Sequence, residues 1–249
     1  MSYSIALAGK GGTGKTTVAG FLIRYLVSEG RTPVLAVDAD ANSNLNEVLG
    51  LEISETLGDA REEMKKGVSS GMTKDVFMEM KLQEAVIESS GFDLIVMGRP
   101  EGAGCYCAAN SLLTMYLEKL IKNYEMVVTD NEAGMEHISR LTTDNIDDLI
   151  VVSDSSIRGI QAAARIVELT EELKLNIIRK SLIVNRVKDG ERARIEEAVK
   201  KYNLELMGII PEDPVVFDYD LEGKPTSQLG EKSTAVVAAN SIFRGILGR

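Results

Sequence analysis

Short, continuous apolar runs recur along the chain, and most are followed by a turn and then by a helical pattern of apolar residues. Val, Ile and Leu follow one another in these runs instead of alternating with polar residues, which predicts strands buried on both faces. The expected strands are Ser4–Ala8, Val34–Asp38, Leu94–Met97, Met126–Thr129, Leu149–Val152, Ser181–Asn185 and Leu206–Ile210. The expected helices are Lys15–Glu29, Asn110–Asn123, Ile157–Leu173, Arg192–Lys201 and Thr234–Leu247. This alternation predicts an α/β fold, a mostly parallel sheet with right-handed crossovers and helices on both faces.

The segment from Ile53 to Ser90 interrupts the alternation between the second and third expected strands. It is polar and rich in Glu, Lys and Met, and it predicts two or three inserted helices. Such an insertion suits partner binding, because insertions on a core scaffold often carry specificity; a helical cover over one sheet edge is the other interpretation. For a chain of 249 residues we expect a single domain over residues 1–249, with this helical insertion around residues 53–90.

A glycine-rich stretch, GKGGTGKTT over Gly9–Thr17, lies between the first expected strand and the first expected helix. It satisfies the pattern G-x-x-x-x-G-K-[ST], in which backbone N–H groups and the helix dipole cradle phosphates. Lys15 would reach the β- and γ-phosphates, and the Thr16 hydroxyl would bind Mg²⁺. The nucleotide-binding residues predicted in this loop are Gly11, Gly12, Thr13, Gly14, Lys15, Thr16 and Thr17.

An additional lysine, Lys10, stands near the start of this loop and gives the pattern K-G-G-x-G-K-[ST]. The pattern resembles the deviant Walker A motif of the SIMIBI class of NTPases. The resemblance implies that Lys10 reaches across a dimer interface to the nucleotide of the partner subunit. The active form would then be a homodimer with two nucleotides between the subunits, and the catalytic residues would include Lys10, Lys15 and Asp40.

Three carboxylates stand at the carboxyl ends of expected strands and are candidates for the hydrolytic site: Asp38 and Asp40 in VDADANSN, and Asp130 in VVTDNEAG. Ligands of open α/β sheets gather at the carboxyl ends of the strands, so these side chains can face the phosphates. The resemblance implies that Asp40 lies in switch I and activates the attacking water, while Asp38 helps to organise Mg²⁺. Asp130 and Gly134 form a D-x-x-x-G pattern typical of Walker B and switch II, in which Asp130 would hold a magnesium-bound water.

Asn185, which ends the expected strand SLIVN, is the residue predicted to contact the base of the nucleotide. The resembling class carries an Asn there that hydrogen-bonds the purine. A guanine-specific N-K-x-D pattern would need an acid at position 188, where this chain has Lys188, so we expect ATP rather than GTP. Pro211 and Glu212 follow the last expected strand, where the resembling class often flanks the base.

Cys105 and Cys107 are the only cysteines, separated by one residue in GRPEGAGCYCAAN. Paired thiols in a reducing compartment more often indicate metal or redox chemistry than a structural bridge. One C-x-C pair supplies too few ligands for a closed tetrahedral site, but a two-fold dimer would bring four thiolates together. Buried apolar filler and a bridging iron–sulfur cluster are the alternatives.

The P-loop, the C-x-C pair and the D-x-x-x-G-x-E-H string over Asp130–His137 together resemble the CooC-type nickel-insertion ATPases. The resemblance covers nearly the whole chain. It implies one Ni²⁺ per dimer, held by Cys105 and Cys107 of both subunits, with Zn²⁺ able to substitute. It also implies ATP and Mg²⁺ as cofactors, dimerisation driven by ATP or metal, and carbon monoxide dehydrogenase or acetyl-CoA synthase as the client.

Two other functions remain open at this point. A nitrogenase-iron-protein-like reductase would carry a dimer-bridging iron–sulfur cluster, but such proteins take a cysteine from switch II, and Asp130–His137 contains none. A MinD/ParA-like positioning ATPase is the second. The only histidine, His137, is expected to make a dimer-interface or switch contact, with transient metal ligation as the alternative.

The charge balance disfavours a role on DNA or at a membrane. The chain has 38 acidic against 28 basic residues, a net charge of −10, and no dense basic run of the kind that binds phosphates of nucleic acid. It has no apolar run of about 18 residues, and the first strand follows the N-terminus directly, which argues against a spanning helix or a cleavable signal. Ser233–Arg249 is too poor in basic residues for a membrane-binding helix. We therefore expect a cytoplasmic protein without stable membrane association.

Overall fold

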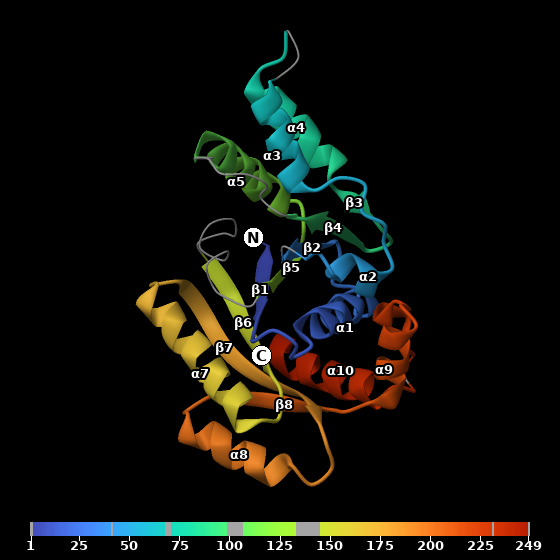
Figure 1. The fold of residues 1–249 in the computed structure, drawn as a ribbon, viewed down its shortest axis with the longest axis vertical. Helices are drawn as coiled ribbons and strands as arrows, with labels where there is room; N and C mark the ends of the chain where they lie inside the picture. The colour runs from blue at the N-terminus through green and yellow to red at the C-terminus, as the bar shows by residue number, and fades with distance from the viewer. Residues whose placement is uncertain are drawn as a thin grey trace.

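The computed structural model describes residues 2–40, 42–67, 71–98, 107–132, 145–230 and 232–248, with the side chains of 65–66 and 107–113 outside the description. Eight strands of this part form one sheet in the order β3-β4-β2-β5-β1-β6-β7-β8 (Figure 1). They are β1 (Tyr3–Ala8), β2 (Val34–Ala39), β3 (Ile87–Glu88), β4 (Phe92–Val96), β5 (Met126–Asn131), β6 (Asn145–Ser153), β7 (Asn176–Val187) and β8 (Leu206–Pro211). All neighbouring strands are parallel except the short β3, which pairs antiparallel with β4.

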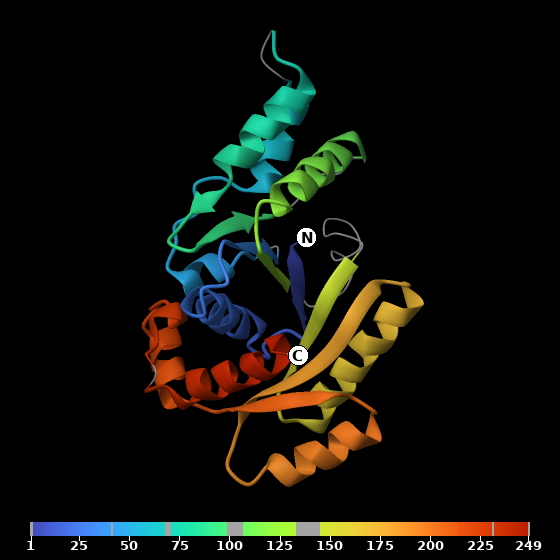
Figure 2. The same ribbon diagram turned by 180° about the vertical axis from the view of Figure 1, so that it is seen from behind.

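Helices cover both faces of this sheet, which confirms the predicted α/β architecture (Figures 1 and 2). The helices of the described residues are α1 (Lys15–Ser28), α2 (Leu45–Leu49), α3 (Leu57–Lys66), α4 (Lys74–Glu84), α5 (Cys107–Ile121), α7 (Ile157–Glu172), α8 (Arg192–Lys201), α9 (Pro214–Leu221) and α10 (Thr234–Leu247), with a 3-10 turn η1 (Thr226–Gln228). Parallel strands joined through helices on both sides explain why the strand runs are continuously apolar.

Three apolar clusters hold the layers together. On one face, Ile5 and Leu7 of β1 pack with α1 and α10, where Phe21 and Phe243 are fully buried. On the other face, α3, α4 and α5 cover β2, β4 and β5, while α7 and α8 cover β1, β6 and β7. The register places Ala6 beside Thr129, so the second and third clusters share one face of the sheet.

The structure extends several predicted elements and adds short ones. β6 begins at Asn145 and β7 at Asn176, several residues before the expected starts, because their first halves pair through backbone hydrogen bonds despite carrying charged side chains. The short elements α2, α9, η1 and β3 were not expected. Within residues 53–90 the structure has α3 and α4, followed by β3.

Candidate functional site

The predicted phosphate loop connects β1 to α1 at the carboxyl edge of the sheet. Gly9 lies against β6, since a Cβ there would come within 2.3 Å of the Val152 carbonyl oxygen. Gly14 precedes the helix in a left-handed conformation, with φ of 85°, and a Cβ there would lie 2.4 Å from Nδ2 of Asn185. Only glycine combines this backbone with such close neighbours, so the loop geometry requires both residues.

The phosphate loop leads into the uncapped N-terminus of α1. The buried Thr13 closes the loop by donating its hydroxyl proton to the Lys10 carbonyl oxygen at 2.9 Å. The first turn of α1 carries no acidic residue and no side-chain cap. Its N–H groups and the positive end of the helix dipole therefore remain available to phosphate. Lys15 is buried, whereas Lys10 is exposed.

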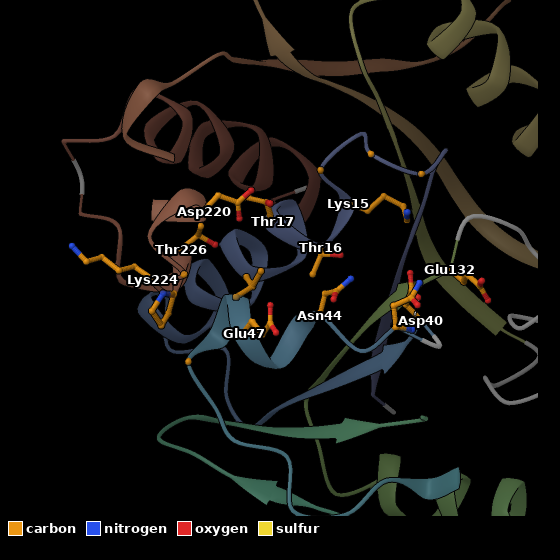
Figure 3. Close-up of a pocket in the computed structure, with 18 residues that line it drawn as sticks. Lys15, Thr16, Thr17, Asp40, Asn44, Glu47, Glu132, Asp220, Lys224 and Thr226 are labelled. Atoms are coloured by element: carbon orange, nitrogen blue, oxygen red, sulfur yellow. Dashed lines mark hydrogen bonds between the residues drawn. The ribbon is translucent and has the colours of Figure 1, made fainter. Parts of the chain in front are cut away.

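A cavity of about 820 Å³ lies next to this loop (Figure 3). Of the predicted site residues, those that line it are Gly11, Gly12, Gly14, Lys15, Thr16, Thr17 and Asp40. Sequence reasoning missed the remaining walls, which come from the loop after β2, from α2, from the residue directly after β5, and from α9, η1 and their connection. These are Asn42, Asn44, Glu47, Val48, Gly50, Glu132, Asp220, Gly223, Lys224, Pro225 and Thr226. They are brought together only by the fold, so no local pattern could have identified them.

Asp38 faces the backbone of the loop that follows its own strand. Its carboxylate accepts hydrogen bonds from the N–H groups of Asp40 at 3.1 Å and Leu45 at 3.0 Å. The side chain is fully buried, and burial raises its pKa to about 6 despite these bonds. The structure therefore places Asp38 as the anchor of the predicted switch I. The Asp40 carboxylate lies in the cavity wall and accepts from Asn42 N–H at 2.8 Å.

Asp130 lies beside Asp38, its register partner across β2 and β5. Burial raises the pKa of Asp130 to about 7, opposed by a hydrogen bond from Thr16 and by the charge of Lys15. Its Oδ1 is buried and has no hydrogen-bond partner within the described part of the chain. A buried carboxylate oxygen without a donor, next to a threonine hydroxyl, is a set of hard oxygen donors that suits Mg²⁺. Thr16 and Asp130, with Asp38 behind them, are the residues that would hold it.

The residues predicted to meet the base lie at the carboxyl ends of β7 and β8. Asn185 is buried, and its Nδ2 donates to the Thr13 carbonyl oxygen at 3.0 Å, so its amide contacts the phosphate loop. Pro211 pairs with Val187, and the Glu212 N–H donates to the Val187 carbonyl oxygen at 2.9 Å. Neither Pro211 nor Glu212 belongs to the cavity wall. Their contact with the base stays a prediction.

The predicted metal loop and most of switch II fall outside the described residues. Cys105, Gly134 and His137 lie there, and Cys107 is described only as the first residue of α5. The chain enters the cysteine segment through Met97 and Gly98, which directly follow β4.

The parallel sheet, the glycine-rich loop and the cavity above it define a P-loop nucleotide-binding fold. Residues 4–226 match the family model of the CobQ/CobB/MinD/ParA nucleotide binding domain. An uncharacterized ATP-binding protein of Methanocaldococcus jannaschii is 42% identical over 250 residues, 98% of each chain. The carbon monoxide dehydrogenase accessory protein CooC of Rhodospirillum rubrum is 34% identical over 190 residues, covering 70% of this chain and 71% of CooC.

Solved structures agree with this assignment. The MinC:MinD cell division protein complex of Aquifex aeolicus contains a chain that superposes with a TM-score of 0.75 at 25% identity, covering 100% of this chain and 96% of that one. The protein belongs to the CobQ/CobB/MinD/ParA family of P-loop NTPases and is an ATP-binding ATPase of the MinD/ParA type. Within the described residues, no helix is long and apolar enough to cross a bilayer.

Proposed function

We propose that this ATPase is a nickel chaperone that inserts Ni²⁺ into carbon monoxide dehydrogenase or acetyl-CoA synthase. The observation that carries the proposal is the C-x-C pair, Cys105 and Cys107, in a chain that is 34% identical to a carbon monoxide dehydrogenase accessory protein. Thiolates are soft ligands that suit this class of metal. A dimer would supply four thiolates at one interface. The two cysteines of each subunit, too few for a metal site alone, would then form a complete site together.

The structure supports a connection between the nucleotide and the cysteine segment. The Met97 N–H donates to the Asp38 carbonyl oxygen at 2.9 Å, and the Met97 carbonyl oxygen accepts from Gly58 N–H of α3 at 2.9 Å. Next along the chain, Gly98 packs against Thr56, the residue that caps α3; a Cβ on Gly98 would lie 2.4 Å from the Thr56 hydroxyl oxygen. Met97, which leads into the cysteine segment, is thereby hydrogen-bonded to Asp38, the residue at which the predicted switch I begins.

In the proposed cycle, the phosphate loop binds ATP through Lys15 and the N–H groups of the first helical turn. Lys10 then contacts the nucleotide of the partner subunit and closes the dimer. Asp40 orients the attacking water, and hydrolysis releases the loop anchored by Asp38. Since ATP and the metal both favour the closed dimer, each should raise the affinity for the other.

The test is a Ni²⁺ titration of the reduced, metal-free protein. We expect saturation near one ion per dimer, with thiolate-to-metal charge-transfer bands in the near ultraviolet. Cys105→Ser and Cys107→Ser should each abolish this binding, while ATP binding by the monomer is preserved, because the phosphates are held by a different loop. Affinity should also fall at lower pH, since the thiols must lose protons to ligate the metal. Full Ni²⁺ binding by both serine variants would contradict the proposal.

Two alternatives are distinguished by the same preparation. Stoichiometric iron and sulfide with reversible redox bands, after anaerobic purification, would indicate the reductase. The similarity to MinD favours a positioning ATPase as the second candidate. In MinD-like positioning we would expect ATP-dependent binding to anionic vesicles. The helix α10 is poorly suited to that role, because most of its apolar side chains are buried against α1 and β8.

A further inference from the structure

We propose that Glu132 is a second catalytic carboxylate of this ATPase and that it shares with Asp40 the water that attacks the γ-phosphate. Each carboxylate accepts one hydrogen bond from that water, so the two together fix its orientation. The inference rests on the hydrolysis step of the proposed cycle, and it is independent of nickel and of the client enzyme.

Asp40 and Glu132 follow two neighbouring parallel strands at the same level of the sheet. The register between β2 and β5 pairs Ala39 with Asn131, the last residue of each strand. Asp40 and Glu132 are the next residues along the two segments, and both line the nucleotide cavity. Figure 3 shows them next to each other, at the end of the cavity where Lys15 lies. The fold therefore brings a second carboxylate to the proposed catalytic one.

Two pairs of carboxylates follow one another at this edge of the sheet, and they differ in burial. The inner pair, Asp38 and Asp130, are register partners, and both side chains are buried. The outer pair, Asp40 and Glu132, stand two residues further along and are half-buried. The inner pair fits the roles already described, as the anchor of switch I and as part of the magnesium site. The outer pair reaches the cavity, where a water from solvent can be held.

The spacing of the two strands suits a water held between the outer carboxylates. Neighbouring strands of a sheet lie about 4.8 Å apart. A water that donates to two oxygens at about 2.8 Å each joins atoms roughly 4.5 Å apart. Asp40 accepts from the Asn42 N–H through Oδ1, and a carboxylate has a second oxygen that can accept from water. With both protons held, the water presents a lone pair to the γ-phosphorus.

The chemical step uses both carboxylates and consumes neither. The water oxygen forms a bond to the γ-phosphorus, and the bond from phosphorus to the bridging oxygen of ADP breaks. The proton that the water loses passes to one of the two carboxylates and from there to the phosphate product. Asp40 belongs to the predicted switch I and Glu132 to the predicted switch II. The water is therefore oriented only when both segments are in place, which couples hydrolysis to closure of the site.

Single-turnover hydrolysis of ATP by the full-length protein with Mg²⁺ tests this role. Glu132→Gln keeps the size of the side chain and removes its charge, so ATP should bind at least as tightly as to the wild type. Hydrolysis should slow by roughly 10–100-fold, the worth of one hydrogen bond to a charged group. Glu125→Gln is the matched control, because Glu125 is exposed at the opposite end of the same strand, directly before β5. A wild-type rate in Glu132→Gln, or an equal loss in both variants, would overturn the proposal.

Two further measurements separate a shared water from other roles of Glu132. If both carboxylates hold one water, the double variant Asp40→Ala/Glu132→Ala should hydrolyse ATP about as slowly as Asp40→Ala alone. Losses that multiply would show that the two residues act in separate steps, which contradicts the shared water. The Mg²⁺ concentration for half-maximal hydrolysis should be the same in Glu132→Gln and wild type, and an increase would make Glu132 a metal ligand instead. Slow turnover in Glu132→Gln with a wild-type rate in Asp40→Ala would also overturn the pair, and none of these results bears on Ni²⁺ binding by the cysteines.

Discussion

Lys15 and Asp40 belong to different parts of the nucleotide cavity, and their loss should affect different steps. Lys15 is the buried cation of the phosphate loop, so Lys15→Ala should lose ATP affinity by roughly 10–100-fold, the worth of a charge-assisted hydrogen bond. Asp40→Ala should still bind ATP but hydrolyse it about a hundredfold more slowly, because water activation uses a separate carboxylate. Equilibrium binding and single-turnover hydrolysis measure the two effects separately.

Asp40→Asn is the control for this pair of variants. Asp40 accepts a hydrogen bond from the Asn42 N–H, and an asparagine oxygen can keep that bond while the charge is removed. Slow turnover in both Asp40→Ala and Asp40→Asn would assign the effect to the charge. Turnover at the wild-type rate in Asp40→Ala would remove Asp40 from the catalytic role.

Single residues were predictable from the sequence where a local motif fixes them. The order Gly-Lys-Thr at the start of α1 determines which groups face the phosphates, and Lys15 and Thr16 lie in the cavity wall as expected. The contact of Asn185 with the purine stays a prediction, but the sequence did not predict that its amide also donates to the Thr13 carbonyl oxygen. That contact joins residues 172 positions apart, and only the folded chain reveals it. The cavity residue Asp220 was missed for the same reason.

At the scale of elements, Asp213 joins the starts of two helices. Its carboxylate accepts from the Val215 N–H of α9 at 3.0 Å and from the Ala235 N–H of α10 at 3.1 Å. It also accepts from the hydroxyls of Ser233 at 2.7 Å and Thr234 at 3.2 Å. Because α9 loses its N-cap and α10 loses the acceptor of its Ala235 N–H, Asp213→Ala should reduce the free energy of unfolding by about 2–4 kcal/mol, as measured by urea denaturation.

The pH dependence gives a second check on Asp213. Burial acts to raise the pKa of this carboxyl, but the four hydrogen bonds outweigh it and lower the pKa below the ordinary value of 3.8. A carboxyl with a lowered folded-state pKa stabilises the protein above its unfolded pKa and loses this effect as the pH falls through the folded value. The destabilisation of Asp213→Ala should therefore be complete at neutral pH and shrink below about pH 4. Asp189→Ala, in an exposed turn, is the control, and an equal loss of stability there would contradict the capping role.

Long elements were predictable from the sequence and short ones were not. The helices α1, α7, α8 and α10 begin and end within one residue of their expected bounds, because each is long enough for its apolar residues to form a recognisable run or periodic pattern. The short α2 and α9 have too few residues for a periodic pattern. α9 has no buried residue and begins at the Asp213 cap, so tertiary contact supports it more than its own sequence does.

For the whole molecule, the order of apolar runs was sufficient to predict the sheet and its two helical layers. It was not sufficient to place the site residues on the cavity wall, since the wall is assembled from four separate segments of the chain, within residues 11–17, 40–50, 132 and 220–226. Asp38 and Asp130 are 92 positions apart in the sequence, yet they are register partners in the sheet. They meet because β5 lies between β2 and β1 in the strand order. Strand order, which the pattern leaves undetermined, decides which carboxylates meet.

Assembly is the property of the whole molecule that Lys10 should control. Lys15 of the phosphate loop is buried, whereas Lys10 of the same loop is exposed. The Lys10 side chain is therefore accessible to a partner subunit. If Lys10 contacts the partner's triphosphate, Lys10→Ala should weaken ATP-dependent dimerisation by roughly 10–100-fold, the worth of one charge-assisted hydrogen bond. Light scattering or sedimentation of chelated protein measures this, since metal could also drive association.

The matched control for Lys10→Ala is Lys122→Ala, which removes the same charge from an exposed position just before β5, at the opposite edge of the sheet. Net charge changes equally in the two variants, so a general electrostatic effect would alter both alike. We expect Lys122→Ala to dimerise with ATP as the wild type does, and Lys10→Ala to remain monomeric at the same concentration. Both variants should bind ATP as monomers, because the phosphates are held by Lys15 and the loop N–H groups. Equal ATP-driven dimerisation of Lys10→Ala and wild type would show that Lys10 makes no contact in trans.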